Sequence, residues 1–451
     1  MNQLALLFLL AASTALATLP RQWAPLPLLA GACYMTLGQG VELGPFSFTI
    51  IRMLIFIGVM RVLIRGERTA EGFTRMDWLM LCWGVWALCA STFHEEPQET
   101  LINRLGMVYN VFGVYFLIRC FCQSHADVVR IVRWTAIILA PVALEMLLEH
   151  TTHRNLFAVF GGVEEISEIR NGRLRSQGPF AHSILAGTVG AVCAPLMIGL
   201  WHKHPLTAKT GLIACLLMVV TSASSGPLAS LIVAAFALVL WRWRHLTRQM
   251  RIATIAGYIL LDLVMKAPAY YLIARIDLVG GSSGYHRAAL IESSIKHLRE
   301  WWFAGTDYTR HWMPTGVTWS VDHTDITNYY LSLGVKGGLP LMVLFILILW
   351  TGFRNVGHTL RGRASSPIED QFFVWSIGAS LMAHAATAIS VSYFDQSVVF
   401  IYLTLALTTS LAAVSQGNPA LAETQDSLVE DEPDGANPLD TVACTQRQPI
   451  R

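Results

Sequence analysis

Residues 327–350 read TNYYLSLGVKGGLPLMVLFILILW, and Lys336 is the one charged side chain in this stretch. A helix crosses the ~30 Å hydrocarbon core of a bilayer with about 20 predominantly apolar residues. The stretch is long enough and apolar enough for such a crossing. It therefore predicts a transmembrane helix.

Comparable apolar segments recur along the rest of the chain. With the first stretch, they cover residues 3–19, 23–38, 47–64, 77–92, 101–121, 129–148, 180–201, 208–222, 225–241, 251–266, 327–350, 370–390 and 396–414. Only 14% of the residues are charged, whereas soluble domains carry about a quarter. The sequence predicts an all-α polytopic membrane protein with thirteen transmembrane helices, or twelve if one of the first two segments re-enters the membrane without crossing. The first segment lacks the basic region of a signal peptide and is expected to be a retained helix.

Lysine and arginine are distributed unevenly between alternate connections. Connections 18–22, 61–77, 119–133, 201–210, 241–251 and 351–368 hold 17 of these residues, and connections 38–47, 92–100, 221–226 and 390–397 hold none. Cytoplasmic loops carry the excess of positive charge in membrane proteins. The first set is therefore predicted to be cytoplasmic and the second to face outward.

Two long polar loops then fall on the outer side, and any chemistry is expected there. The predicted organisation is N-terminal transmembrane helices (1–148), an extracytoplasmic loop (149–179), further transmembrane helices (180–266), a large extracytoplasmic loop with an amphipathic helix (267–326), C-terminal transmembrane helices (327–414) and a disordered acidic cytoplasmic tail (415–451). The chain has eight cysteines but no Cys/His spacing typical of zinc, so neither a disulfide nor a metal site is expected. The small net charge of +2 gives no indication of nucleic-acid binding.

The first candidate site is the segment IRNGRLRSQGPFAHSILAG, with Arg170, Arg173 and Arg175. Guanidinium groups bind phosphate bidentately, and the start of the following helix offers free N–H groups. Together they predict a pyrophosphate seat; contact with lipid headgroups is the alternative. His182 is a supporting candidate in the first turn of that helix, although a helix-start polar residue is the favoured interpretation.

The second candidate site opens the large loop. GGSSGYHRAALIESSIKHLREWWFAG predicts a Gly/Ser turn and then an amphipathic helix. Its apolar side chains recur at helical spacing and are expected to pack on the membrane face or on other helices; they are Ile291, Ile295, Leu298 and Trp302. Arg287 lies in the first turn, where an anion would dock, or is a solvated surface charge.

The third candidate site, SVDHTDITNYYLSLG, places His323 between Asp322 and Asp325. A histidine oriented by a carboxylate is suited to act as a general base toward a hydroxyl group. Asp325 or Thr327 is alternatively a helix N-cap, and His323 an ordinary loop histidine.

Charged residues also lie within the predicted spans, where charge is costly and usually paired or functional. Arg52, Arg104, Glu145 and Glu149 fall in the outer halves of their helices. Arg52 and Arg104 are supporting candidates for the site. A structural ion pair between Arg52 and Glu145 is the favoured alternative for Arg52.

Four motifs, in this order, resemble the O-antigen ligase and polymerase superfamily of polysaccharide-assembly membrane proteins. They are RLRSQGPFAHSILAG (173–187), TSASSGPLAS (221–230), GYHRAALIESSIKHLREWWFAGTD (284–307) and HTDITNYYLSLGVKGGLPLMVLF (323–345). The resemblance covers residues 170–350; the first 150 residues are similar only in hydropathy. Many members have an arginine in the turn where this chain has Ser224-Ser225-Gly226, and a histidine directly before Asn328, where this chain has Thr327.

The resemblance implies a glycosyltransferase in exopolysaccharide or O-antigen synthesis, multi-pass in the bacterial cytoplasmic (inner) membrane, with its active site facing the periplasm or exterior. It would move a glycan from undecaprenyl diphosphate to the hydroxyl of an acceptor glycan or lipid, without metal or cofactor. Partners would include membrane lipids and other polysaccharide-assembly proteins. Arg175 (or Arg173) and Arg287 match the diphosphate-binding arginines. His323 approximately matches the catalytic base, with Asp325 as the alternative.

Two other classes of function remain open. A lipid-glycan flippase or transporter would need charges along a path across the whole bilayer, whereas the charges here gather at the outer side. A non-catalytic partner of a polysaccharide synthase would need no site at all.

Overall fold

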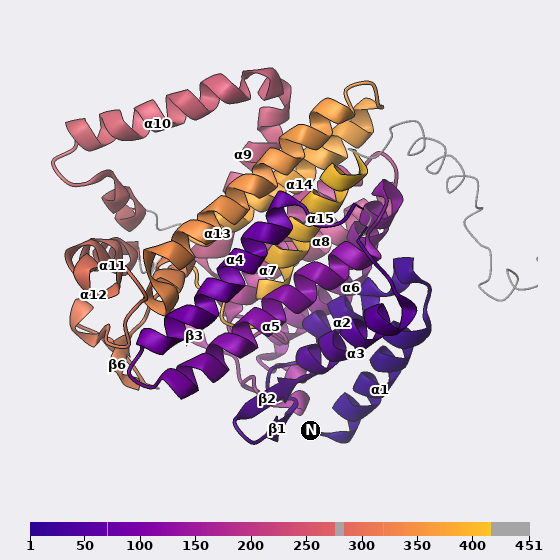
Figure 1. Ribbon diagram of the computed structural model, residues 1–451, viewed down its shortest axis with the longest axis horizontal. Coiled ribbons are helices and arrows are strands. Elements are labelled where there is room, and N and C mark those ends of the chain that lie inside the picture. Colours follow the sequence, from indigo (N-terminus) through magenta and orange to yellow (C-terminus); the bar gives the residue numbers. More distant parts are fainter. Residues whose placement is uncertain (70, 276–283, 319, 416–451) are drawn as a thin grey trace, which may run out of the picture.

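The computed structural model describes residues 1–69, 71–275, 284–318 and 320–415, and these are mostly helical (Figure 1). Each of the thirteen predicted segments contains one helix: α1 (Gln3–Thr18), α2 (Pro25–Tyr34), α3 (Ile50–Arg65), α4 (Arg75–Ala90), α5 (Pro97–Phe121), α6 (His125–Thr152), α7 (Ser183–Gly199), α8 (Pro205–Thr221), α9 (Ser225–Val239), α10 (Thr247–Val264), α13 (Tyr329–Gly362), α14 (Ile368–Thr387) and α15 (Val398–Val414). The all-α prediction is confirmed. The predicted tail after Ser415 and the turn residues 280–283 lie outside the described residues.

Short elements occupy the connections. The helical ones are η1 (Arg21–Trp23), η2 (Ser91–Phe93), η3 (Leu156–Phe160), η4 (Leu240–Leu246), η5 (Ala269–Arg275), α11 (Gly284–Lys296), α12 (Leu298–Trp301) and η6 (Arg310–Trp312). Three antiparallel hairpins, which the sequence did not predict, are β1 (Gly40–Leu43) with β2 (Phe46–Thr49), β3 (Ile169–Arg170) with β4 (Arg173–Leu174), and β5 (Gly316–Val317) with β6 (Ser320–Thr324).

The connections rich in lysine and arginine meet at one end of the bundle, the basic end. Arg21 contacts Gln123, whose side chain in turn donates to the carbonyl of Arg68. Lys203 lies 3.0 Å from Asp370. Four of the six basic connections are thus joined to one another or to the start of α14, as expected if they lie on one side of a membrane.

The long loops and the connections without lysine or arginine meet at the opposite end, the loop end. Gln39 binds the carbonyl of Phe160, and Gln396 donates to the carbonyl of Pro179 at 2.7 Å. The three hairpins also belong to these loops, and Figure 1 shows β1, β2, β6, α11 and α12 gathered on one side of the bundle. Alternate helices therefore run in opposite directions between the two ends.

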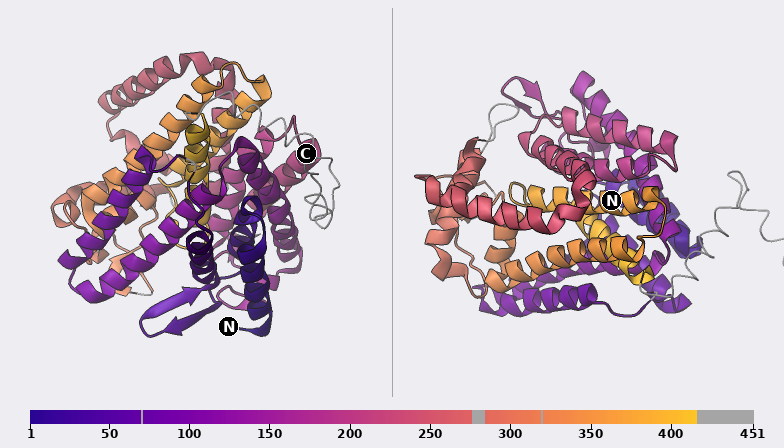
Figure 2. Two further views of the ribbon diagram at one scale, coloured as in Figure 1. Left: turned by 45° about the vertical axis from the view of Figure 1, so that its right-hand side comes forward. Right: turned by 90° about the horizontal axis from the view of Figure 1, so that it is seen from above.

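The core forms around α7 and α15. Every residue of α15 from Val399 to Ala413 is buried, and α7 is buried along most of its length. A helix that is apolar all round belongs in an interior. Helices α6, α8, α9 and α14 pack on α7, and α5 and α13 pack on α15. Both views in Figure 2 show α15, in yellow, lying among the other helices.

Five of the described helical segments are long and apolar enough to cross a membrane: Arg75–Phe93, Pro97–Phe121, His125–Thr152, Ser225–Val264 and Tyr329–Gly362. Four further apolar helices have 10 to 17 residues. The number of twelve or thirteen crossings stays a prediction. Helix α10 buries no residue and lies beside the bundle rather than in it (Figure 1).

Helix α13 is broken at Gly337-Gly338, and the large loop packs into the break. Gly338 has φ of +73°, a conformation that favours glycine. The N–H of Leu339 donates to the carbonyl of Trp302 at 2.8 Å, and the N–H of Thr306 donates to Val335 at 2.9 Å. The backbone groups released by the break thus fix the end of the large loop to the bundle.

Candidate functional site

The first candidate segment folds into a compact loop before α7, here called the arginine loop (residues 167–182). Strands β3 and β4 form its hairpin, and Asn171-Gly172 is the turn, with φ of +52° and +73°. Asn-Gly is the preferred pair for such a two-residue turn because both positions need positive φ. The hairpin brings the arginines of this segment to the loop end.

Glu149, at the end of α6, binds the backbone and a side chain of the arginine loop. Its fully buried carboxylate accepts hydrogen bonds from the N–H of Gly178 (2.8 Å), the N–H of Gln177 (3.0 Å) and the hydroxyl of Ser167 (2.6 Å). A carboxylate that receives several donors is strongly held. These contacts explain why a charged residue stands in the apolar helix α6: Glu149 positions the arginine loop.

Asp395 and Gln396, in the connection before α15, also bind the backbone of the arginine loop. Asp395 accepts from the N–H of Ala181 at 2.9 Å. Asn155 donates to the carbonyl of Gly178 at 2.8 Å. The backbone that leads from Arg175 into α7 is consequently fixed by side chains from three different parts of the chain.

Arg175 is buried, with 4% of its surface exposed. Its Nη1 donates to Glu168 at 2.7 Å and its Nη2 to the hydroxyl of Ser224 at 2.9 Å. Burial lowers the pKa of Arg175, and the Glu168 carboxylate acts in the opposite direction. Because arginine keeps its proton in proteins, Arg175 presents a fixed positive charge whose orientation is set by the turn between α8 and α9.

Arg287, on the first turn of α11, is also buried, with 8% exposed. Among the residues that the structure describes, its guanidinium makes no hydrogen bond or ion pair, and its Nε is a buried donor without a partner. Burial and the positive charge of Arg170 lower the pKa of Arg287, and Asp325 partly offsets them. A buried charge without a partner is costly, so this position favours an anionic ligand.

The candidate segments converge around these arginines. The charges of Arg175, Arg170 and Asp325 all act on His182, which stands directly before α7. The Nε2 of His286 lies 3.0 Å from the carbonyl of Asp325, which joins the start of α11 to the segment before α13. His182 caps α7 by accepting from the N–H of Ile184 at 3.1 Å, as the favoured interpretation had it. The fold thus brings together residues more than a hundred positions apart in the sequence.

His323 lies on β6, where its Nδ1 is 2.7 Å from the hydroxyl of Ser320. Asp325, two residues later, has an exposed side chain, and its negative charge acts on both Arg287 and His182. Of the two candidate bases, Asp325 is therefore the one whose charge acts on the buried Arg287.

Arg173 lines a cavity beside the arginine loop. The cavity has a volume of about 630 Å³ and is bounded by His150, His153, Arg173 and Ser224, with apolar side chains from α8 and α9. This volume is within the range of small-ligand sites. Ser224 lines the cavity and also accepts a hydrogen bond from Arg175, so the cavity adjoins Arg175.

The other two supporting candidates lie elsewhere. Arg52 donates to Asn110 at 3.2 Å and to the carbonyl of Ser47, and it lines an apolar cavity of about 720 Å³ between α3 and α5. The predicted pair with Glu145 is wrong: Glu145 instead accepts from the N–H of Leu156 at 2.9 Å, because α6 packs on α8 while α3 packs on α5.

Arg104, on α5, has Asp307 and Lys336 as its charged neighbours. Its side chain makes no hydrogen bond or ion pair within the described ranges, and its Nε is buried. Arg104 and Lys336 therefore form a second group of positive charge at the loop end, next to the break in α13.

The predicted apolar face of the loop helix is only partly the buried one. Leu290 and Trp301 are buried in a small core with Trp312. Of the predicted face, Ile291 packs against this core, whereas Ile295, Leu298 and Trp302 are exposed. The bend at His297, between α11 and α12, rotates the later residues away from one continuous face. The three exposed side chains are free to meet a membrane surface, one of the two predicted environments.

The geometry allows one kind of chemistry in particular. Arg175 and Arg287 offer buried, fixed positive charge, and Asp325 offers a carboxylate nearby. Such an arrangement can bind a phosphate group and stabilise negative charge that grows on it. No family model matches the chain, and no curated protein matches it.

Proposed function

We propose that this protein is a multi-pass glycosyltransferase of the O-antigen ligase and polymerase type. It transfers a glycan from undecaprenyl diphosphate to an acceptor hydroxyl at the outer face of the bacterial cytoplasmic membrane, in exopolysaccharide or O-antigen synthesis. The basic end then faces the cytoplasm, the loop end faces the periplasm or exterior, and the C-terminus is cytoplasmic.

The observation that carries the proposal is Arg287, a buried arginine without a partner among the described residues. Arg170 and Asp325 act on both Arg287 and His182, and Arg175 acts on His182, so these residues share one region at the end of the bundle that collects the long loops. A lipid-linked diphosphate at the membrane surface has the charge that this region needs, and its polyprenyl tail would remain in the bilayer.

The reaction breaks the bond between the anomeric carbon and the diphosphate oxygen and forms a bond from that carbon to the acceptor oxygen. Arg175 and Arg287 would stabilise the negative charge on the departing diphosphate. Asp325, or His323 as the alternative, would take the proton of the acceptor hydroxyl. No metal or nucleotide sugar is required by this scheme.

The test uses purified full-length protein and lipid-linked glycan, with product analysed by gel and mass spectrometry. We expect R287A and R175A to lose at least about tenfold in turnover, whereas R299A keeps it, because Arg299 is an exposed arginine on the same loop. Full activity of R175A, R287A and H323A alike would overturn the assignment of the site.

The same purified protein and variants also test the two alternative functions, a flippase and a non-catalytic partner of a synthase. Formation of longer or newly attached glycan in detergent, with no second compartment, excludes transport alone. Normal glycan linkage in cells that carry only the arginine variants would instead favour a non-catalytic partner.

A further inference from the structure

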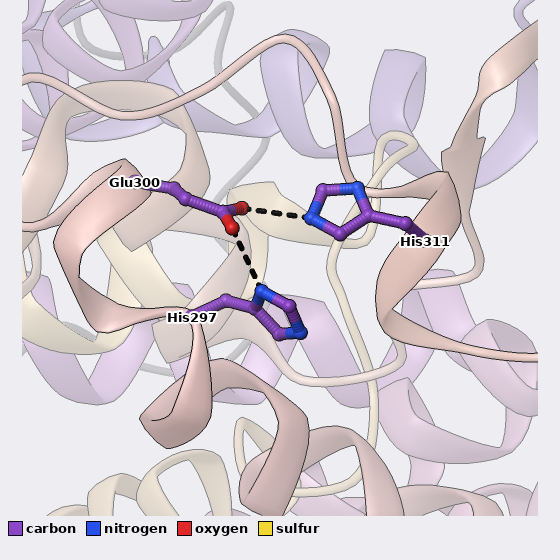
Figure 3. A group of neighbouring side chains, drawn as sticks. All are labelled: His297, Glu300 and His311. Carbon is purple, nitrogen blue, oxygen red and sulfur yellow. Dashed lines mark hydrogen bonds and ion pairs between the residues drawn. The ribbon is translucent and has the colours of Figure 1, made fainter.

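Three side chains of the large loop converge at a place that the proposed reaction does not use. Figure 3 shows the Glu300 carboxylate between the imidazoles of His297 and His311. The Nδ1 of His297 lies 2.7 Å from Oε1 of Glu300, and the Nε2 of His311 lies 2.9 Å from Oε2. The donor atoms of all three lie within 4.8 Å of one another.

The local sequence explains why these groups meet. His297 precedes α12 and Glu300 lies three residues later, a spacing that puts both side chains on one face of a helical turn. His311 comes from η6, which is fixed to α11 because the hydroxyl of Ser293 donates to the carbonyl of Trp312 at 2.9 Å. The site is thus made from two elements and has no compact sequence motif, which is why the sequence predicted no metal.

We propose that His297, Glu300 and His311 bind one Zn²⁺ ion, with water in the remaining position. Zinc takes imidazole nitrogen and carboxylate oxygen at about 2.0–2.2 Å in tetrahedral geometry, which requires donor atoms roughly 3.3 Å apart. Both histidine–carboxylate distances are shorter than this, and no two of the donor atoms are more than 4.8 Å apart, so the three side chains could close around one ion by side-chain rotation. Mg²⁺ and Ca²⁺ prefer oxygen ligands and fit this set poorly.

A neighbouring side chain orients the carboxylate. The indole Nε1 of Trp312 donates to Oε2 of Glu300 at 3.0 Å, and the Trp312 ring stacks on His297 with an interplanar angle of 13°. Metal ligands are commonly oriented by such outer contacts. His311 and Glu300 are exposed at their edges, which leaves a path for the ion and a place for the water.

A bound ion would act as a link between two elements of the large loop. The site joins α12 to η6 a few residues before the segment that packs into the break of α13. An ion there would link the two halves of the large loop and limit their separation. This role is independent of the proposed glycosyl transfer, in which no metal takes part.

The experiment measures zinc bound to the full-length protein, purified without a polyhistidine tag and treated with a chelator. We expect one equivalent of Zn²⁺ by isothermal titration and by metal analysis after gel filtration, and Co²⁺ should give the visible absorption of a tetrahedral site. W312F should weaken binding by about tenfold, and the double variant H297A/H311A should lose it. H358A, which removes an exposed histidine of α13, is the matched control.

A second measurement covers the case in which the double variant does not fold. In the wild type, Zn²⁺ but not Mg²⁺ should slow proteolytic cleavage between residues 297 and 312. Lack of a bound equivalent, equal binding by a folded double variant, or unchanged cleavage in the presence of Zn²⁺ would each overturn the proposal and leave a hydrogen-bonded His-Glu-His group.

Discussion

The Nη2 of Arg175 lies 2.9 Å from the hydroxyl oxygen of Ser224, although 49 residues separate them. Arg175 ends the hairpin of the arginine loop, and Ser224 stands in the turn between α8 and α9. The contact joins the first two motifs of the resemblance at the turn where many members carry an arginine. The serine here orients an arginine supplied by the neighbouring motif.

Replacing Ser224 tests this relationship. In S224A the guanidinium of Arg175 loses one of its two side-chain partners but keeps Glu168, so it should rotate without leaving the site. Under the proposed glycosyl transfer, we expect KM for the lipid-linked donor to rise severalfold and kcat to fall less, measured with purified protein.

S365A, which removes an exposed serine at the basic end, is the control and should behave as the wild type. Unchanged KM in S224A would show that Arg175 does not depend on this hydroxyl for its position.

Glu149 should matter for stability more than its place in an apolar helix suggests. E149A leaves the N–H groups of Gln177 and Gly178 without their acceptor, and hydrogen bonds to a charged group contribute about 1.5–3 kcal/mol each. We expect the apparent Tm in detergent to fall clearly in E149A, and to fall less in E149Q, which keeps one acceptor oxygen.

E164Q, at an exposed acid of the long loop 149–179 just before the arginine loop, is the matched control. If the apparent Tm of E149A equals that of E164Q and the wild type, the carboxylate does not hold the arginine loop.

The sequence predicted the helices better than the contacts between them. Length and hydropathy are local properties, so each of the thirteen apolar segments does contain a helix. Helix ends were less accurate: residues 97–100 extend α5 by one turn before the predicted start, where Pro97 is the first helical residue. The Asn171-Gly172 pair is typical of a hairpin turn, but a prediction from hydropathy alone does not detect it.

The site could be predicted only as a set of residue types. Glu149 binds backbone N–H groups, which have no sequence identity, so nothing in the motif marks its partner. The pairing of Arg52 with Asn110 rather than Glu145 depends on which helices are neighbours, and hydropathy does not determine that. The meeting of His297, Glu300 and His311 was not predicted for the same reason: it depends on which elements of the large loop are neighbours.

Gly338 is expected to be the least replaceable glycine of α13. A Cβ there would lie 2.0 Å from the carbonyl oxygen of Phe303, and its φ of +73° disfavours other residues. G338A should detach the loop segment that Trp302 and Thr306 fix to the break. We expect a lower Tm and faster proteolysis of the large loop.

G357A is the control on the same helix, because a Cβ at Gly357 meets no atom within 4 Å. Alanine is favoured over glycine inside a helix by about 1 kcal/mol, so G357A should be as stable as the wild type or more so. Equal loss in both variants would mean that helix propensity, and not loop packing, is being measured.

Asp307 should make the stability of the large loop depend on acid pH. Burial alone would raise its pKa, but the N–H of Glu95 (2.9 Å), the ring of His94 (2.5 Å) and the charge of Arg104 outweigh this, so the pKa lies below its ordinary value of 3.8. A carboxyl whose pKa is lowered on folding stabilises the protein above the unfolded pKa and stops doing so as pH falls through the folded one. The Tm of the wild type should therefore exceed that of D307N near pH 6, and the difference should shrink below about pH 4. D322N, at an exposed aspartate of β6, is the control, and its Tm should follow that of the wild type at every pH. If the Tm difference between the wild type and D307N stays constant down to pH 3, the ionised carboxylate is not what holds this segment.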